Sequence, residues 1–166
     1  MDRRRLQEIL VTVELFESWG VAVFPGPFGE KGVRVKEWPA VPAEDACRRA
    51  KAAAANELGR INLAARTGPT ARGDCLAVID LDGRDDVEPD GALSRLLTLL
   101  PEGVAVSSSG RGFHVWFTVK EPAGNGVLSA YGADIFTDTH LVNLPPSQHP
   151  TGRLYEWLRP PGGRLP

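Results

Sequence analysis

Apolar and polar residues alternate with two different periods along this chain, and each period predicts a kind of element. Apolar positions at helical spacing from Leu6 to Phe16 predict an N-terminal amphipathic helix that ends near Gly20. Two further helices are expected at about 43–58 and 93–100, the latter with Asp90 as N-cap. Strands are expected near 21–24, 61–65, 76–82, 104–106, 113–119, 133–136, 141–143 and 154–157, with a loop rich in Pro and Gly at 25–39. These elements and their hairpin-like spacings predict an α+β fold with an antiparallel or mixed sheet.

Length and composition narrow the class of protein. The 166 residues suit one domain, and no apolar run approaches the roughly 18 residues that suggest a membrane span. The basic start is followed by a segment, 6–16, that polar residues interrupt, so a signal peptide is not expected and a cytoplasmic location is. Cys47 and Cys75 lie far apart and outside any metal-ligand spacing, which argues against a zinc site.

The distribution of charge says more than its total of -2. Residues 74–100 hold 7 acidic side chains and only two basic ones, Arg84 and Arg95, while the chain before them is mildly basic. A metal site that handles a polyanion has this character, and so does a solvated acidic loop.

The first candidate site is the end of the apolar strand 76–83. Alternate side chains of a strand share a face, so Asp80 and Asp82 point the same way, roughly 7 Å apart. Such a carboxylate pair can hold two divalent ions for phosphoryl transfer, and Mg²⁺ or Mn²⁺ suits all-oxygen ligands. Taken alone, the pair fits better with an acidic turn that caps the strand.

Two later segments add candidate ligands. In 107–117, His114 shares a face with Trp116, and the glycines before it allow backbone N–H groups to approach an anion, although a hairpin turn with an ordinary histidine is the structural alternative. Asp134 lies between small and apolar residues, as an inward-pointing carboxylate or a turn residue does. In 144–157, Ser147, His149 and Arg153 are candidate phosphate contacts, whereas Tyr155 and Trp157 are typical core residues.

Taken in order, these motifs resemble the N-terminal domain of the bifunctional DNA primase/polymerases (Prim-Pol), of the archaeo-eukaryotic primase superfamily. The motifs are DLDG at 80–83, SGRGFHVWF at 109–117, ADI at 133–135 and PPSQHPTGRLYEW at 145–157. Upstream, WGVAVFP at 19–25, Lys36 with Trp38, and NLAARTG at 62–68 extend the resemblance over about 5–158.

The resemblance implies a primase catalytic core over 1–158: an N-terminal α/β module of about 1–73, an RRM-like metal-site module of about 74–158 with flanking helices, and a linker-like tail at 159–166. It implies that Asp80, Asp82 and Asp134 hold two Mg²⁺ or Mn²⁺ ions and are the catalytic carboxylates. It also implies that His114 contacts the triphosphate of the incoming nucleotide. The expected nucleotide-binding residues are His114, Gly112, Arg111 and Ser109, and the weaker candidates for phosphate or template contacts are Lys36, Arg66, Ser147 and Arg153.

The implied activity is template-directed nucleotidyl transfer in DNA replication or priming. The implied partners are single-stranded DNA, nucleoside triphosphates and a helicase domain or subunit, with no membrane. The chain departs from the family at Phe136, where many relatives carry Arg, and in the acidic loop that holds Asp85, Asp86 and Glu88. Two alternatives remain: an RRM-like single-stranded nucleic-acid or nucleotide-binding module with weak catalysis, and a metal-dependent nuclease.

Overall fold

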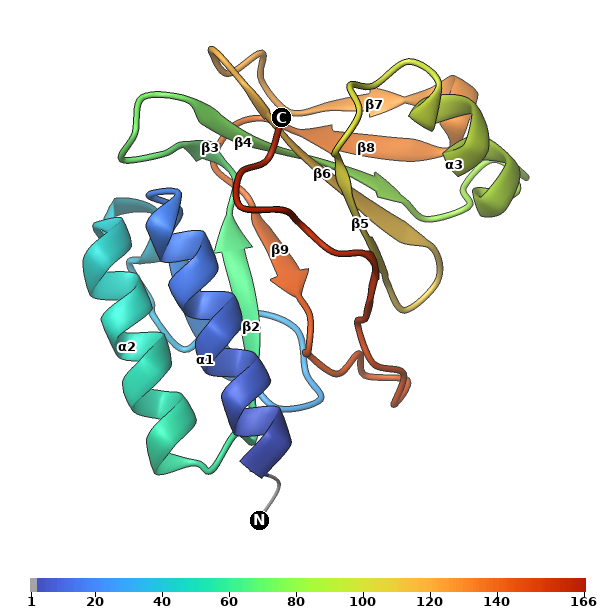
Figure 1. Cartoon of the computed structure of the whole chain (residues 1–166). Coiled ribbons are helices and arrows are strands. Elements are labelled where there is room, and N and C mark those ends of the chain that lie inside the picture. Colours follow the sequence, from blue (N-terminus) through green and yellow to red (C-terminus); the bar gives the residue numbers. More distant parts are fainter. Residues whose placement is uncertain (1–2) are drawn as a thin grey trace.

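Three helices and two antiparallel sheets build the structure, a computed structural model that describes residues 3–166 (Figure 1). The helices are α1 (Arg3–Ser18), α2 (Ala43–Asn56) and α3 (Pro89–Leu97), and short 3-10 turns lie at η1 (Trp38–Ala40) and η2 (Ser129–Tyr131). None of the helices in this part of the chain has the length and apolar character needed to cross a membrane. The predicted α+β class is confirmed.

The smaller sheet has the strand order β1 (Val23–Pro27), β2 (Ile61–Arg66), β9 (Leu141–Leu144). In Figure 1, α1 and α2 lie side by side over one face of this sheet. Buried residues of α1, including Ile9, Val13 and Phe16, pack into one core with Ile61 and Leu63 of β2. The smaller sheet thus combines two strands from the N-terminal module expected at about 1–73 with β9, which comes from residues 141–144.

The larger sheet has seven strands. Its order is β10 (Trp157–Arg159), β5 (Ala105–Ser108), β6 (Phe113–Val119), β4 (Cys75–Leu81), β8 (Ala133–Phe136) and β7 (Gly126–Leu128), and β3 (Gly68–Pro69) also pairs with β4. Helix α3 covers one face through Ala92 and Leu96, which pack with Ala77 and Ile79.

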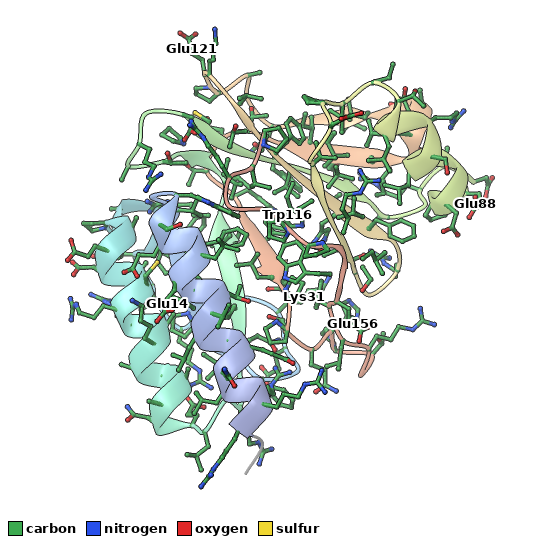
Figure 2. The ribbon with its side chains drawn as sticks, viewed as in Figure 1. Glu14, Lys31, Glu88, Trp116, Glu121 and Glu156 are labelled. Carbon is green, nitrogen blue, oxygen red and sulfur yellow. The ribbon has the colours of Figure 1, made fainter. Side chains whose placement is uncertain are left out.

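The central strand β4 divides its side chains between two cores. Ala77, Ile79 and Leu81 belong to the α3 core, and Leu76 and Val78 belong to the core of the smaller sheet. This is the predicted alternation, with the addition that both faces are covered along most of the strand. Trp116 of β6, near the centre of the molecule in Figure 2, packs in the same core as Val78.

Several strands differ from the sequence-based expectation. Pro25-Gly26-Pro27 was expected in a loop but forms part of β1 and pairs with β2. Proline lacks an N–H donor, and it is tolerated there because β1 is an edge strand. The strand expected at 154–157 is shifted to Trp157–Arg159, and β7 was not expected.

The last residues, expected to be a linker-like tail, pack against the domain. Leu165 is buried in the core of the smaller sheet. Trp19 Nε1 donates a hydrogen bond to the carbonyl of Gly163, and Thr118 donates two to the carbonyl of Pro166. In Figure 1 this segment crosses in front of the two sheets, so it joins them.

Candidate active site

A single row of side chains crosses the larger sheet at the end of β4. In the strand register, Ser107 of β5 stands opposite His114 of β6, His114 opposite Asp80 of β4, and Asp80 opposite Asp134 of β8. Opposite residues in antiparallel strands have Cα atoms about 4.5–5.5 Å apart. We call Ser107, His114, Asp80 and Asp134 the cross-strand row. The strand pairing brings together two of the predicted carboxylates and the predicted histidine.

The centre of this row holds polar groups that are buried but incompletely bonded. His114 is 5 % exposed, and its Nε2 lies 3.4 Å from Asp80 Oδ1, close enough for a charge contact but not for a well-formed hydrogen bond. Within residues 3–166, the buried side-chain atoms without a hydrogen-bond partner are Asp80 Oδ1 and His114 Nδ1. Burial acts to raise the pKa of Asp80, but the interaction with His114 and other neighbouring groups outweighs it and holds the pKa below its ordinary value.

Two arginines neutralise the flanking carboxylates. Arg84 Nη2 lies 2.5 Å from Asp134 Oδ1, and Arg111 Nη2 lies 3.0 Å from Asp82 Oδ2. Asp82 is the first residue after β4, so it stands two positions beyond Asp80 on the same side of the chain. The three predicted carboxylates therefore lie at one end of the sheet, two of them paired with guanidinium groups.

These residues fit a divalent cation by their chemistry. Across the described residues 3–166, no three acidic, histidine or cysteine side chains already form a metal cluster. However, the carboxylate oxygens are the ligands that Mg²⁺ and Mn²⁺ prefer, and Asp80 Oδ1 has no other hydrogen-bond partner. For Asp82 and Asp134 to serve as ligands, Arg111 and Arg84 would have to move aside.

The β5–β6 hairpin was expected to present backbone N–H groups to an anion. Instead, Ser109 Oγ accepts hydrogen bonds from the N–H groups of Gly112 and Arg111, which closes the turn. Gly112 is required for a different reason: a Cβ atom there would lie 1.7 Å from the carbonyl oxygen of Leu81. This close approach fixes the hairpin against the end of β4, next to Asp82.

A cleft of about 620 Å³ opens beside this hairpin. Its walls include Ser109, Arg111, Gly112 and Arg153. Arg111 joins this cleft to the carboxylates, because the same side chain also contacts Asp82. The structure thus brings together four of the residues that the sequence suggested for nucleotide or phosphate contacts.

The other three candidates lie in different surroundings. Lys36 is exposed in the loop before η1. Arg66 Nη1 donates to the carbonyls of Trp38, Pro39 and Val41, and burial lowers the pKa of this guanidinium. Ser147 is fully buried, and its hydroxyl accepts from the N–H of Leu63 and donates to the carbonyl of Leu63. Arg66 and Ser147 thus stabilise the fold through hydrogen bonds to backbone groups.

Sequence reasoning missed three neighbours of the row. One is Arg84, whose basic charge within an acidic stretch was a usable signal. Another is the ring of Tyr155, which lies 5.7 Å from that of His114. The third is His140, whose ring stacks on that of Phe136 with the ring centroids 3.8 Å apart. No pattern in the sequence indicates the last two contacts.

One family of known proteins matches nearly the whole chain. Residues 12–166 match the family described as bifunctional DNA primase/polymerase, N-terminal. Comparison with curated proteins gives no match. The family match covers nearly the whole chain, including every strand of both sheets, and the α+β architecture is consistent with a primase-type core. The chain therefore belongs to the bifunctional DNA primase/polymerase N-terminal (Prim-Pol) family, whose members act in general as DNA primases and polymerases on DNA and nucleotides.

Proposed function

We propose that the cross-strand row and Asp82 form the active site of a DNA primase/polymerase domain that joins nucleotides on a single-stranded template. The observation that carries this proposal is the strand register, which aligns His114, Asp80 and Asp134 side by side. A structural acidic turn at Asp80 and Asp82 would not need a partner carboxylate from β8 or a histidine from β6.

In this proposal Asp80, Asp82 and Asp134 hold two Mg²⁺ or Mn²⁺ ions. When bound, such ions lower the pKa of an attacking hydroxyl and neutralise the triphosphate. The low pKa of Asp80 keeps its carboxylate ionised at neutral pH, as a metal ligand must be. No covalent intermediate on the protein is needed.

The remaining contacts serve the nucleotide. His114 Nδ1 is buried without a partner, and a triphosphate oxygen would supply one after a small rearrangement of the side chains that cover it. Ser109, Arg111 and Arg153 line the cleft of about 620 Å³, where two guanidinium groups would add charge stabilisation at the phosphates. Gly112 keeps this cleft against the end of β4.

A binding module with weak catalysis is the second candidate. It is favoured by the two ion pairs, Arg84 with Asp134 and Arg111 with Asp82, because both must open before the carboxylates can bind metal. The cross-strand row itself favours the enzyme, since RRM-type recognition uses exposed aromatic side chains on the sheet, and the row carries charged ones.

The experiment compares synthesis by the wild-type chain and by Asp80→Asn and Asp134→Asn. Purified protein is given single-stranded template, with and without a primer, all eight ribo- and deoxynucleoside triphosphates, and Mn²⁺ or Mg²⁺. The matched control is Asp45→Asn, because Asp45 also pairs with an arginine, Arg48, at 2.5 Å but lies on α2.

We expect the wild type and the control to make product, and both site variants to lose at least about a hundredfold in rate. Tight template binding without synthesis in the wild type would favour the binding module. Shortening of the template that depends on Asp80 would favour a nuclease.

A further inference from the structure

Arg84 interacts with all three candidate carboxylates, not only with the one that it pairs with. Its guanidinium contacts Asp134 at 2.5 Å, and the charges of Asp82 and Asp80 act on it as well. The guanidinium of Arg84 therefore lies within the electric field of all three carboxylates.

The backbone around Arg84 holds it beside β8. Its N–H contacts the carbonyl of Gly132, the residue before β8, and its carbonyl accepts from the N–H of Val87. Asp85 and Asp86 both adopt left-handed backbone conformations, with φ of 57° and 59°, which side chains rarely take. This short, bent loop holds the backbone of Arg84 next to the start of β8, and the side chain extends to Asp134.

The far end of the same loop is anchored on α3. The Glu88 side chain accepts hydrogen bonds from the N–H groups of Asp90 and Gly91, which caps the helix. Figure 2 shows Glu88 at the outer edge of the molecule, beside α3. The carboxylate of Glu88 therefore caps α3.

The ion pair between Arg84 and Asp134 is accessible to solvent. The side chain of Arg84 is 43 % exposed and that of Asp134 is 26 % exposed, so water reaches both. Ion pairs with this exposure are weak, because water screens the two charges and competes for their hydrogen bonds. Arg111, at 64 % exposure, pairs with Asp82 in a similar way but belongs to the wall of the cleft.

We propose that Arg84 is a stand-in cation: it neutralises Asp134 while no divalent ion is bound, and it turns to the nucleotide triphosphate when an ion takes its place. This inference rests on the proposed function. It assigns a phosphate contact to a residue outside the motifs that carry the family resemblance.

The inference predicts effects of opposite sign on two ligands. Without Arg84, the carboxylates no longer have a competing cation, so Mn²⁺ alone binds more tightly. Without Arg84, a triphosphate loses a guanidinium partner, so Mn²⁺-bound triphosphate binds more weakly. A purely structural role would weaken both or neither.

The test is calorimetric titration of Arg84→Ala with Mn²⁺ alone, and then with inorganic tripolyphosphate in saturating Mn²⁺. We expect Mn²⁺ to bind about two- to fivefold more tightly than to the wild type, the range that a half-exposed ion pair allows. We expect tripolyphosphate to bind at least about threefold more weakly. The matched control is Arg48→Ala, which removes an arginine that pairs with Asp45 at 2.5 Å on α2 and should change neither affinity.

Arg84→Gln serves as a second neutral variant if Arg84→Ala unfolds. Arg84→Lys keeps the charge, so its affinities for Mn²⁺ and for tripolyphosphate should lie closer to those of the wild type. Unchanged or weaker Mn²⁺ binding in both neutral variants, with wild-type Mn²⁺ binding intact, would overturn this inference alone. A wild-type chain that binds no Mn²⁺ would overturn the proposed function and this inference together.

Discussion

Buried polar side chains around β2 have hydrogen-bond partners for their polar atoms, whereas those around β4 have polar atoms without partners. Next to β2, the amide of Asn62 donates to the carbonyls of Glu30 and Gln148 and accepts from the N–H of Gln148. Ser147 completes two bonds with Leu63. Next to β4, Asp80 and His114 each keep a buried polar atom without a hydrogen-bond partner.

We call the fully bonded polar groups around β2 the frame, and the incompletely bonded groups around β4 the site. Buried polar groups in folded proteins are nearly always bonded, so the bonded set near β2 accounts for stability and needs no ligand. The incomplete set near β4 costs stability and is explained if a ligand completes it. Substitutions in the two regions should therefore affect different measurements, and the following variants test this in order of expected size.

The largest effect is expected where frame and site touch. In Gly112→Ala the new Cβ would collide with the backbone carbonyl of Leu81, so the end of β4 or the hairpin must shift. We expect a loss of about 3 kcal/mol in the free energy of unfolding, measured by urea denaturation, together with loss of synthesis. Gly163→Ala is the control, because its Cβ meets no atom within 4 Å; equal stability of the two variants would contradict the steric argument.

A frame residue should affect stability alone. Ser147→Ala leaves the N–H and carbonyl of Leu63 without their side-chain partner, and we expect a loss of about 1–3 kcal/mol. The affinity for Mn²⁺ should stay unchanged, which calorimetry can check. Ser94→Ala, which removes an exposed hydroxyl on α3, should have little effect on stability. A change in Mn²⁺ affinity in Ser147→Ala would show that the two regions are coupled.

The frame also has a pH dependence that does not involve the site. Burial raises the pKa of Cys47 to about 11, so the folded chain keeps its thiol protonated at a pH where the unfolded chain, with an ordinary pKa near 9.0, loses the proton. Stability should therefore be full below pH 9 and fall as pH rises toward 11, by at most about 1.4 kcal/mol per pH unit for this thiol. Cys47→Ala should flatten the decline in urea denaturation between these pH values. An equally steep decline in the variant would assign it to other groups.

A site residue should affect ligand binding and leave stability almost unchanged. Asp134→Asn removes a half-exposed ion pair, so the free energy of unfolding should change by less than about 1 kcal/mol. The affinity for Mn²⁺ should fall at least about tenfold, because a carboxylate ligand is lost. A large loss of stability with unchanged Mn²⁺ binding would place Asp134 in the frame and remove the contrast.

Local patterns were enough to predict most elements, and they also singled out Asp80, His114 and Asp134, which the strand register aligns. The helical spacing from Leu6 to Phe16 and the strand alternation through Asp80 depend on neighbours within a few residues. Both are confirmed as elements, α1 and β4. The prolines of β1 misled the prediction because their tolerance depends on β1 being an edge strand, which is a property of the assembled sheet.

Contacts between distant residues could not be predicted in this way. Ser147 lies 84 residues from its partner Leu63, and nothing in the local sequence indicates that its hydroxyl bonds to a strand rather than a phosphate. Arg84 is close in sequence to Asp80 and Asp82, yet it pairs with Asp134, because the bent loop carries it to β8.

The register of the larger sheet also makes the cross-strand row a check on correct folding. Asp80, His114 and Asp134 come from strands whose contacts span many residues, and a slip of one residue in β6 or β8 would turn its side chain to the α3 face. Partly formed sheets would then bury a lone carboxylate among Ala77 and Ile79, at a large cost. The charged side chains of the row therefore penalise misaligned chains during folding.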